Sequence, residues 1–101
     1  MFDKLMQAQQ KAEEIKKRLD NITVVGEAES GKIRVTATGN KKVQSIEIDK
    51  TFLESADKEE LEELLVVAVN KAIEQAENVS QSEMQAATQD MLGGLGNIFG
   101  K

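Results

Sequence analysis

The first stretch of the chain repeats its apolar residues at the spacing of a helix that packs along one seam. Residues 3–20 are mostly strong helix formers and contain no glycine or proline. The apolar positions alternate between steps of three and four, as positions a and d of a heptad do: Leu5, Ala8, Ala12, Ile15, Leu19 and Ile22. This narrow stripe predicts a helix that packs against one partner helix.

Three segments with the patterns of strands follow this helix. Residues 22–29 are rich in valine and contain Gly26, a residue typical of a bulge. Residues 32–38 alternate apolar and polar side chains. In residues 42–49 Val43 falls on the face opposite Ile46 and Ile48, so either a bulge lies near Ser45 or Val43 packs elsewhere. Because the connections, Ser30-Gly31 and Gly39-Asn40, are short turns, the three segments predict an antiparallel meander.

The second half of the chain predicts one long helix. Residues 51–56 are predicted as a connector, and Asp57 is a suitable N-cap. From Leu61 to Ile73 nearly every side of the helix is apolar, and the pattern then thins. A helix that ran to about Asp90 would be roughly 50 Å long. Since a globule of this size has a radius of gyration of about 13 Å, part of the helix must project or pack on another chain.

These elements predict one α+β domain of residues 1–92, followed by a flexible glycine-rich tail, residues 93–101. The candidate core consists of Leu, Ile, Val and Ala, with three Phe and no Trp or Tyr. A domain of this length buries only about 60–65% of the surface that its unfolded chain exposes. Association with a second copy would enlarge such a thin core, so we expect a homodimer.

The composition removes several kinds of chemistry. The absence of cysteine and histidine excludes disulfides, thiolate chemistry, the commonest metal ligand and the commonest general base. No apolar run approaches the roughly 18–20 residues of a membrane span, and the polar N-terminus does not resemble a secretory signal. We therefore expect a cytoplasmic binding protein without a cofactor, a metal, a small-molecule substrate or a membrane contact, and not an enzyme.

The net charge of −5 conceals a polarised distribution. Residues 1–50 carry a net charge of +2, and residues 51–101 carry −7. With Leu5 at heptad position a, a positive strip flanks the first seam: Lys4, Lys11 and Arg18 at g, Lys16 at e and Lys17 at f. Such side chains can pair with acids of a neighbouring helix, which the acidic last helix would supply, or they can contact phosphates.

A second group of cations offers the same choice. Lys32 and Arg34 share a strand face, and Lys41 and Lys42 occupy the following turn. They either extend the phosphate-contacting strip or form an ordinary exposed sheet face.

Several segments, taken in order, resemble the YbaB/EbfC family of bacterial nucleoid-associated proteins. They are residues 5–11 (LMQAQQK), 43–49 (VQSIEID), 53–54 (LE), 57–64 (DKEELEEL) and 68–72 (AVNKA). The resemblance covers roughly residues 3–80, and it rests on the order and spacing of these segments. It implies a tweezer-like, two-fold dimer whose projecting helices bind duplex DNA with little sequence preference in the bacterial nucleoid.

The resemblance also implies that basic residues of the first and last helices contact DNA. In this sequence they are Lys4, Lys11, Lys16, Lys17, Arg18 and Lys71. The last helix departs from the family pattern, because Ala72, Ile73 and Glu74 stand where relatives often carry a basic pair. We expect DNA binding that is weak, salt-sensitive and unspecific. The alternative is a dimeric protein-interaction module that has lost DNA binding and uses its acidic last helix and its tail as contact surfaces.

Overall fold

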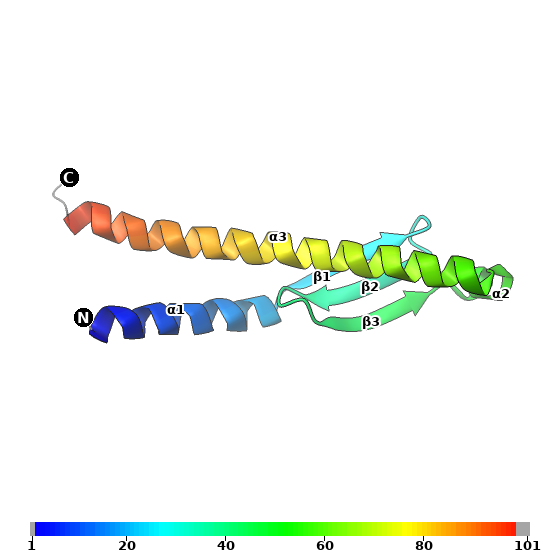
Figure 1. The fold of residues 1–101 in the computed structure, drawn as a ribbon, viewed down its shortest axis with the longest axis horizontal. Coiled ribbons are helices and arrows are strands. Elements are labelled where there is room, and N and C mark those ends of the chain that lie inside the picture. Colours follow the sequence, from blue (N-terminus) through cyan, green and yellow to red (C-terminus); the bar gives the residue numbers. More distant parts are fainter. Residues whose placement is uncertain (1, 99–101) are drawn as a thin grey trace.

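The computed structural model describes residues 2–98, which form an elongated α+β domain (Figure 1). In chain order the elements are α1 (Phe2–Asp20), β1 (Thr23–Ala28), β2 (Ile33–Thr38), β3 (Val43–Ile48), α2 (Lys50–Ser55) and α3 (Lys58–Ile98). The predicted arrangement of an N-terminal helix, a three-stranded meander and a long last helix is confirmed.

The sheet has the order β1-β2-β3, and both pairs of neighbouring strands are antiparallel. Between β2 and β3 the register shifts, since Thr36 lies opposite Ser45 while Ala37 lies opposite Val43. The extra residue in β3 confirms the bulge predicted near Ser45. At Gly26 the pairing with Val35 is regular, so the bulge expected there is wrong.

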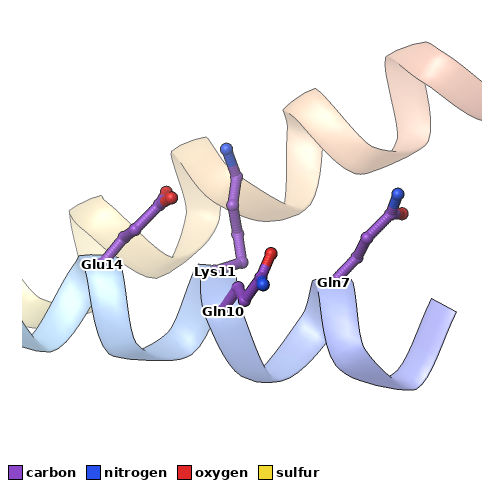
Figure 2. A pocket seen from close by; sticks show the side chains of 4 residues that line it. All are labelled: Gln7, Gln10, Lys11 and Glu14. Atoms are coloured by element: carbon purple, nitrogen blue, oxygen red, sulfur yellow. The ribbon is translucent and has the colours of Figure 1, made fainter. Parts of the chain in front are cut away.

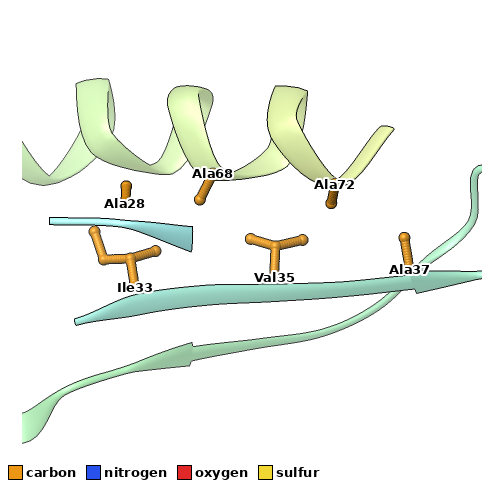
Figure 3. Packing of buried hydrophobic residues seen from close by; sticks show 6 residues of the cluster. All are labelled: Ala28, Ile33, Val35, Ala37, Ala68 and Ala72. Carbon is orange, nitrogen blue, oxygen red and sulfur yellow. The ribbon is translucent and has the colours of Figure 1, made fainter. Parts of the chain in front are cut away.

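The core lies between the sheet and the first half of α3. Figure 3 shows Ile33, Val35 and Ala37 of β2 pointing toward α3, whose Ala68 and Ala72 face them. All five side chains have 0% relative exposure. Because the helix presents alanines, its backbone can approach the sheet closely.

Gly26 lies at the closest approach between β1 and α3. A Cβ atom added to Gly26 would lie 2.9 Å from the Cα of Ala72, and nearer still to the Ala68 carbonyl oxygen and the Ala72 amide nitrogen. Side-chain atoms do not occupy such positions in folded proteins. The glycine is therefore required by helix-on-sheet packing, and not by a bulge.

Helix α1 runs antiparallel to the C-terminal half of α3, and the two helices diverge toward the free end of α1 (Figure 1). Leu19 at the end of α1 is buried and Ile15 is half-buried, but Leu5 and Met6 are 62% and 58% exposed. The predicted seam thus contacts its partner helix only in its C-terminal half.

The projecting helices give the molecule its shape. Its extents are 66 × 24 × 17 Å and its radius of gyration is 19.4 Å, against about 13 Å for a compact chain of this length. The expectation that the last helix projects beyond the domain is confirmed. No helix in residues 2–98 combines the length and the apolar character needed to cross a membrane.

Two boundaries differ from the sequence prediction. Residues 51–55, expected as part of a connector, form α2 together with Lys50, because the Asp49 carboxylate accepts a hydrogen bond from the Phe52 amide at 3.0 Å and the Phe52 ring is buried. Helix α3 continues past Asp90 to Ile98. The flexibility of residues 93–101 stays a prediction, and residues 99–101 lie outside the described part of the chain.

Candidate nucleic-acid interface

Five of the six cations predicted to contact DNA lie on α1, and the sixth, Lys71, lies on α3. The side chains of Lys4, Lys16, Lys17, Arg18 and Lys71 are exposed, and that of Lys11 is half-buried. Lys71 follows Asn70 and precedes Ala72, which packs on the sheet. The structure therefore gathers the α1 cations along the projecting helix and leaves Lys71 apart from them, over the body of the domain.

On one side of the contact between α1 and α3, Arg18 is paired with an acid of the neighbouring helix. Its Nη1 atom lies 2.8 Å from Oε2 of Glu83, and the two side chains are 59% and 23% exposed. The sequence left open whether Arg18 pairs with an acid of a neighbouring helix or contacts phosphate, and in the structure it pairs with an acid of α3. An ion pair with this exposure is worth about 0–1 kcal/mol, so a phosphate can compete with Glu83 for the guanidinium group.

Lys11 lies two turns further toward the N-terminus on the same side of α1. Figure 2 shows its side chain rising toward α3 together with those of Gln7 and Glu14. With Gln10 these residues line an open hollow of about 260 Å³, made by α1 alone. Two amides and one amine can donate hydrogen bonds to a phosphate, whereas the single carboxylate, Glu14, offers no partner for acid–base chemistry.

The opposite side of the contact is formed jointly by α1, α3 and the β2–β3 turn. Lys16 lines a groove of about 180 Å³ with Asn40, Ser80 and Met84. Asn40 donates a hydrogen bond from Nδ2 to the Lys16 carbonyl oxygen at 2.9 Å, and Nζ of Lys41 lies 3.8 Å from Oε1 of Glu77. The sequence carried no signal for the role of Asn40, because it depends on where α1 ends relative to the turn.

Of the second group of cations, Arg34 lies on the outer face of β2 and Lys32 lies in the turn just before that strand. Arg34 pairs with Glu27 at 3.4 Å, and Nζ of Lys32 lies 6.0 Å from the centre of the Phe52 ring. They line a hollow of about 200 Å³ with two carboxylates, Glu47 and Asp49. Asp49 caps α2, and Glu47 lies opposite Arg34 in the sheet. Of the two interpretations from the sequence, an ordinary exposed sheet face therefore fits Lys32 and Arg34 better than an extension of the phosphate-contacting strip.

Charge on the two projecting helices is unequal. All charged residues between Lys71 and Lys101 are acids, namely Glu74, Glu77, Glu83 and Asp90. Helix α1, in contrast, holds five cations and four acids, which gives it a net charge of +1. A polyanion approaching the projecting helices is therefore attracted by α1 and repelled by α3.

Comparison with known proteins gives this surface a context. The model of the YbaB/EbfC DNA-binding family matches residues 1–91. A nucleoid-associated protein of Flavobacterium johnsoniae is 45% identical over 102 residues, covering 98% of this chain and 94% of its own length. A nucleoid-associated protein of Thermus thermophilus is 38% identical over 106 residues, covering 99% and 96%.

The fold is also similar to that of a solved structure. An uncharacterised protein from Helicobacter pylori matches with a TM-score of 0.65 over 77% of this chain and 90% of its own, at 19% identity. At that identity the likeness concerns the fold alone.

Proposed function

The chain belongs to the YbaB/EbfC DNA-binding family, and on that premise we propose that it is a nucleoid-associated protein that binds duplex DNA with little sequence preference. The proposed contacts are Lys4, Lys11, Lys16, Lys17 and Arg18 on α1 and Lys71 on α3. The observation that carries the proposal is the row of exposed cations along α1, on a helix that projects from the domain.

The nature of these side chains supports binding without sequence preference. Lysine amines on an exposed helix contact phosphates, which fix the position of a protein on a duplex but carry little sequence information. Acids of α3 stand close to this strip, as the pair of Arg18 and Glu83 shows. Binding should therefore be weak and should weaken further with salt.

We also propose that the protein acts as a homodimer, through an apolar surface that the single chain leaves bare. Val43 and Ile46 of β3 are 43% and 48% exposed, although they lie on the same face of the sheet as the buried Ala37 and Val35. On α3, Val66 is 60% exposed and lines an apolar hollow of about 250 Å³ with Leu65 and Val69. Exposed apolar residues that gather on neighbouring elements are typical of an interaction surface, whereas single exposed ones are not.

The partner best suited to this surface is a second copy of the chain. Val66 and Ile73 form a stripe of α3, and Glu77, beyond the end of this stripe, lies on the same side of the helix and faces the β2–β3 turn through Lys41. The stripe therefore points to the side of β3. Because one surface contains both an uncovered helix stripe and an uncovered strand, a two-fold axis lets the α3 of each copy cover the β3 of the other.

The DNA proposal is tested by fluorescence anisotropy of a labelled random-sequence duplex, titrated between about 50 and about 200 mM salt. We expect the logarithm of the affinity to fall linearly with the logarithm of the salt concentration. Because each phosphate contact contributes about 0.9 to that slope, Lys4→Gln/Lys17→Gln should reduce it by about 1.8. The control, Lys50→Gln/Lys58→Gln, removes the same charge from the opposite end of the molecule and should leave the slope unchanged.

Equal slopes for the two double variants would refute the assignment to α1. If the folded wild-type protein binds no duplex at either salt concentration, the alternative of a protein-interaction module without DNA binding is favoured instead. Recovery of protein partners from a nuclease-treated extract would then support that alternative.

A further inference from the structure

The β2–β3 turn, residues 39–42, is fixed against the end of α1. The Gly39 amide donates a hydrogen bond to the Leu19 carbonyl oxygen at 3.0 Å, and Asn40 donates to the Lys16 carbonyl oxygen. Within the turn, the Lys41 amide donates to the Thr38 carbonyl oxygen at 2.9 Å. These bonds hold the turn at the base of the projecting helix, so its side chains have a defined position relative to α1.

Lys41 adopts a backbone conformation that is unfavourable for lysine. Its φ is +68°, in the left-handed region that glycine and asparagine enter more readily. The backbone hydrogen bond from Lys41 to Thr38 holds the residue in this conformation. The side-chain amine of Lys41 reaches out of the turn toward α3, where its only ion-pair partner among the described residues is Glu77, at 3.8 Å.

Three cations lie on the two elements joined here by Asn40: Lys16 of α1 and Lys41 and Lys42 of the turn, which we call the elbow cluster. All three side chains are exposed. Between Glu29 and Glu47 the chain has no acid, so the acids that face the cluster come from the neighbouring helices. They are Glu77 of α3 and Asp20 of α1, whose carboxylate accepts a hydrogen bond from Asn40.

We propose that the elbow cluster is a second phosphate-contacting surface for duplex DNA, which extends the contact from α1 onto the body of the domain. The inference rests on the proposed function, because it assumes that a duplex lies along α1. Over its 19 residues α1 spans about 28 Å, so a duplex aligned with it reaches the turn at its base. In this arrangement Glu77 competes with phosphate for Lys41 and lowers the affinity.

The first test is Lys41→Asn/Lys42→Gln in the full chain, measured by anisotropy with the labelled random-sequence duplex. Asparagine is favoured at positive φ, so we expect the stability toward urea to be kept or raised. The salt slope should nevertheless fall by about 1.8, since two phosphate contacts are lost. A merely structural role of the turn would not combine unchanged stability with a smaller slope. The control is again Lys50→Gln/Lys58→Gln.

The second test is Glu77→Gln, which frees the Lys41 amine. We expect duplex binding to tighten about two- to five-fold, the range expected for an exposed ion pair. The gain should vanish when Lys41→Asn is added. A gain that persists in the Lys41→Asn background would assign the effect to the lost charge of Glu77 alone and overturn the contact to Lys41.

The two proposals fail in different ways. Normal wild-type binding with an unchanged slope in Lys41→Asn/Lys42→Gln would overturn the elbow cluster and leave the α1 contacts standing. Absence of binding by the folded wild-type protein would overturn both.

Discussion

At the scale of single residues, Gly26 decides how closely α3 lies on the sheet. It is buried in β1, and its missing side chain leaves room for the backbone of α3 at Ala68 and Ala72. The alanines and the glycine together allow a helix-to-sheet contact with almost no side chain between the two backbones. In a core whose largest fully buried side chains are Ile33 and Val35, this closeness replaces bulk as the source of packing contacts.

We expect Gly26→Ala to destabilise the protein by about 1–3 kcal/mol, since the new methyl group meets backbone atoms that cannot rotate away. The measurement is urea unfolding followed by circular dichroism. Val25→Ala is the matched control, because Val25 is the neighbouring residue of β1 on the opposite face and is 42% exposed. A Gly26→Ala variant as stable as wild type would mean that α3 can lift from β1 at little cost.

At the scale of elements, α1 is anchored at one end. Leu19 is 4% exposed and receives the β2–β3 turn, since the Gly39 amide bonds to its carbonyl oxygen. Toward the N-terminus, Leu5 is exposed and the helix diverges from α3 (Figure 1). Among the described residues, the Arg18–Glu83 pair is the only side-chain ion pair between the two helices.

The two ends of the seam should therefore differ in their response to mutation. Leu19→Ala removes a buried side chain and is expected to cost about 2–4 kcal/mol of unfolding free energy. Leu5→Ala is expected to change it by less than about 0.5 kcal/mol. Urea titrations of both variants give the comparison. A large cost for Leu5→Ala would show that the N-terminal half of the seam is covered in solution by another chain.

The sequence predicted the strands better than it predicted the contacts of the site. Alternation placed Ile33, Val35 and Ala37 on one face because the period of a strand is local. Helix α2 was missed because its six residues are too few for a helical period, and its capping residue Asp49 looked like the end of a strand.

The contacts of the site could be predicted only in part, for a different reason. That Lys4, Lys11 and Arg18 share one side of α1 follows from helical spacing alone. The partners Glu83 of Arg18 and Glu77 of Lys41 depend on the register between elements far apart in the chain. No local pattern records that register, so the sequence left both alternatives open for the cations.

At the scale of the whole molecule, α3 of the single chain covers only part of the apolar face of its sheet. Helix α3 lies over β1 and β2, and on the face of β3 that continues the core Ile48 packs against the core while Val43 and Ile46 are exposed. The chain is also far longer than a globule of its size. Both features are understandable if the stable form contains a second copy, which supplies the missing layer over β3.

Light scattering coupled to size exclusion should therefore give twice the chain mass of 11.1 kDa for the wild-type protein. Ile46→Glu/Val66→Glu places two charges in the proposed interface and should shift the mass to that of one chain. The control is Val67→Glu, at a 41% exposed valine on a different side of α3, which should stay dimeric. A dimeric Ile46→Glu/Val66→Glu variant would show that the copies meet elsewhere.

Because α1 is anchored only at its C-terminal end, it can rotate as a rigid helix about that end. The helix extends about 21 Å from the anchored Leu19 to Leu5, so a rotation of about 10° about Leu19 moves the free end by about 4 Å. Such a displacement breaks few contacts, because the N-terminal half of the apolar seam of α1 makes few contacts with α3. In the proposed complex, the free end of α1 could follow a groove of the duplex that widens, narrows or bends, while its cations stay in contact with phosphates. In that complex the movable helix would accommodate the sequence-dependent differences in DNA shape that a rigid clamp would discriminate, so the mechanics of the fold would contribute to the proposed tolerance toward sequence.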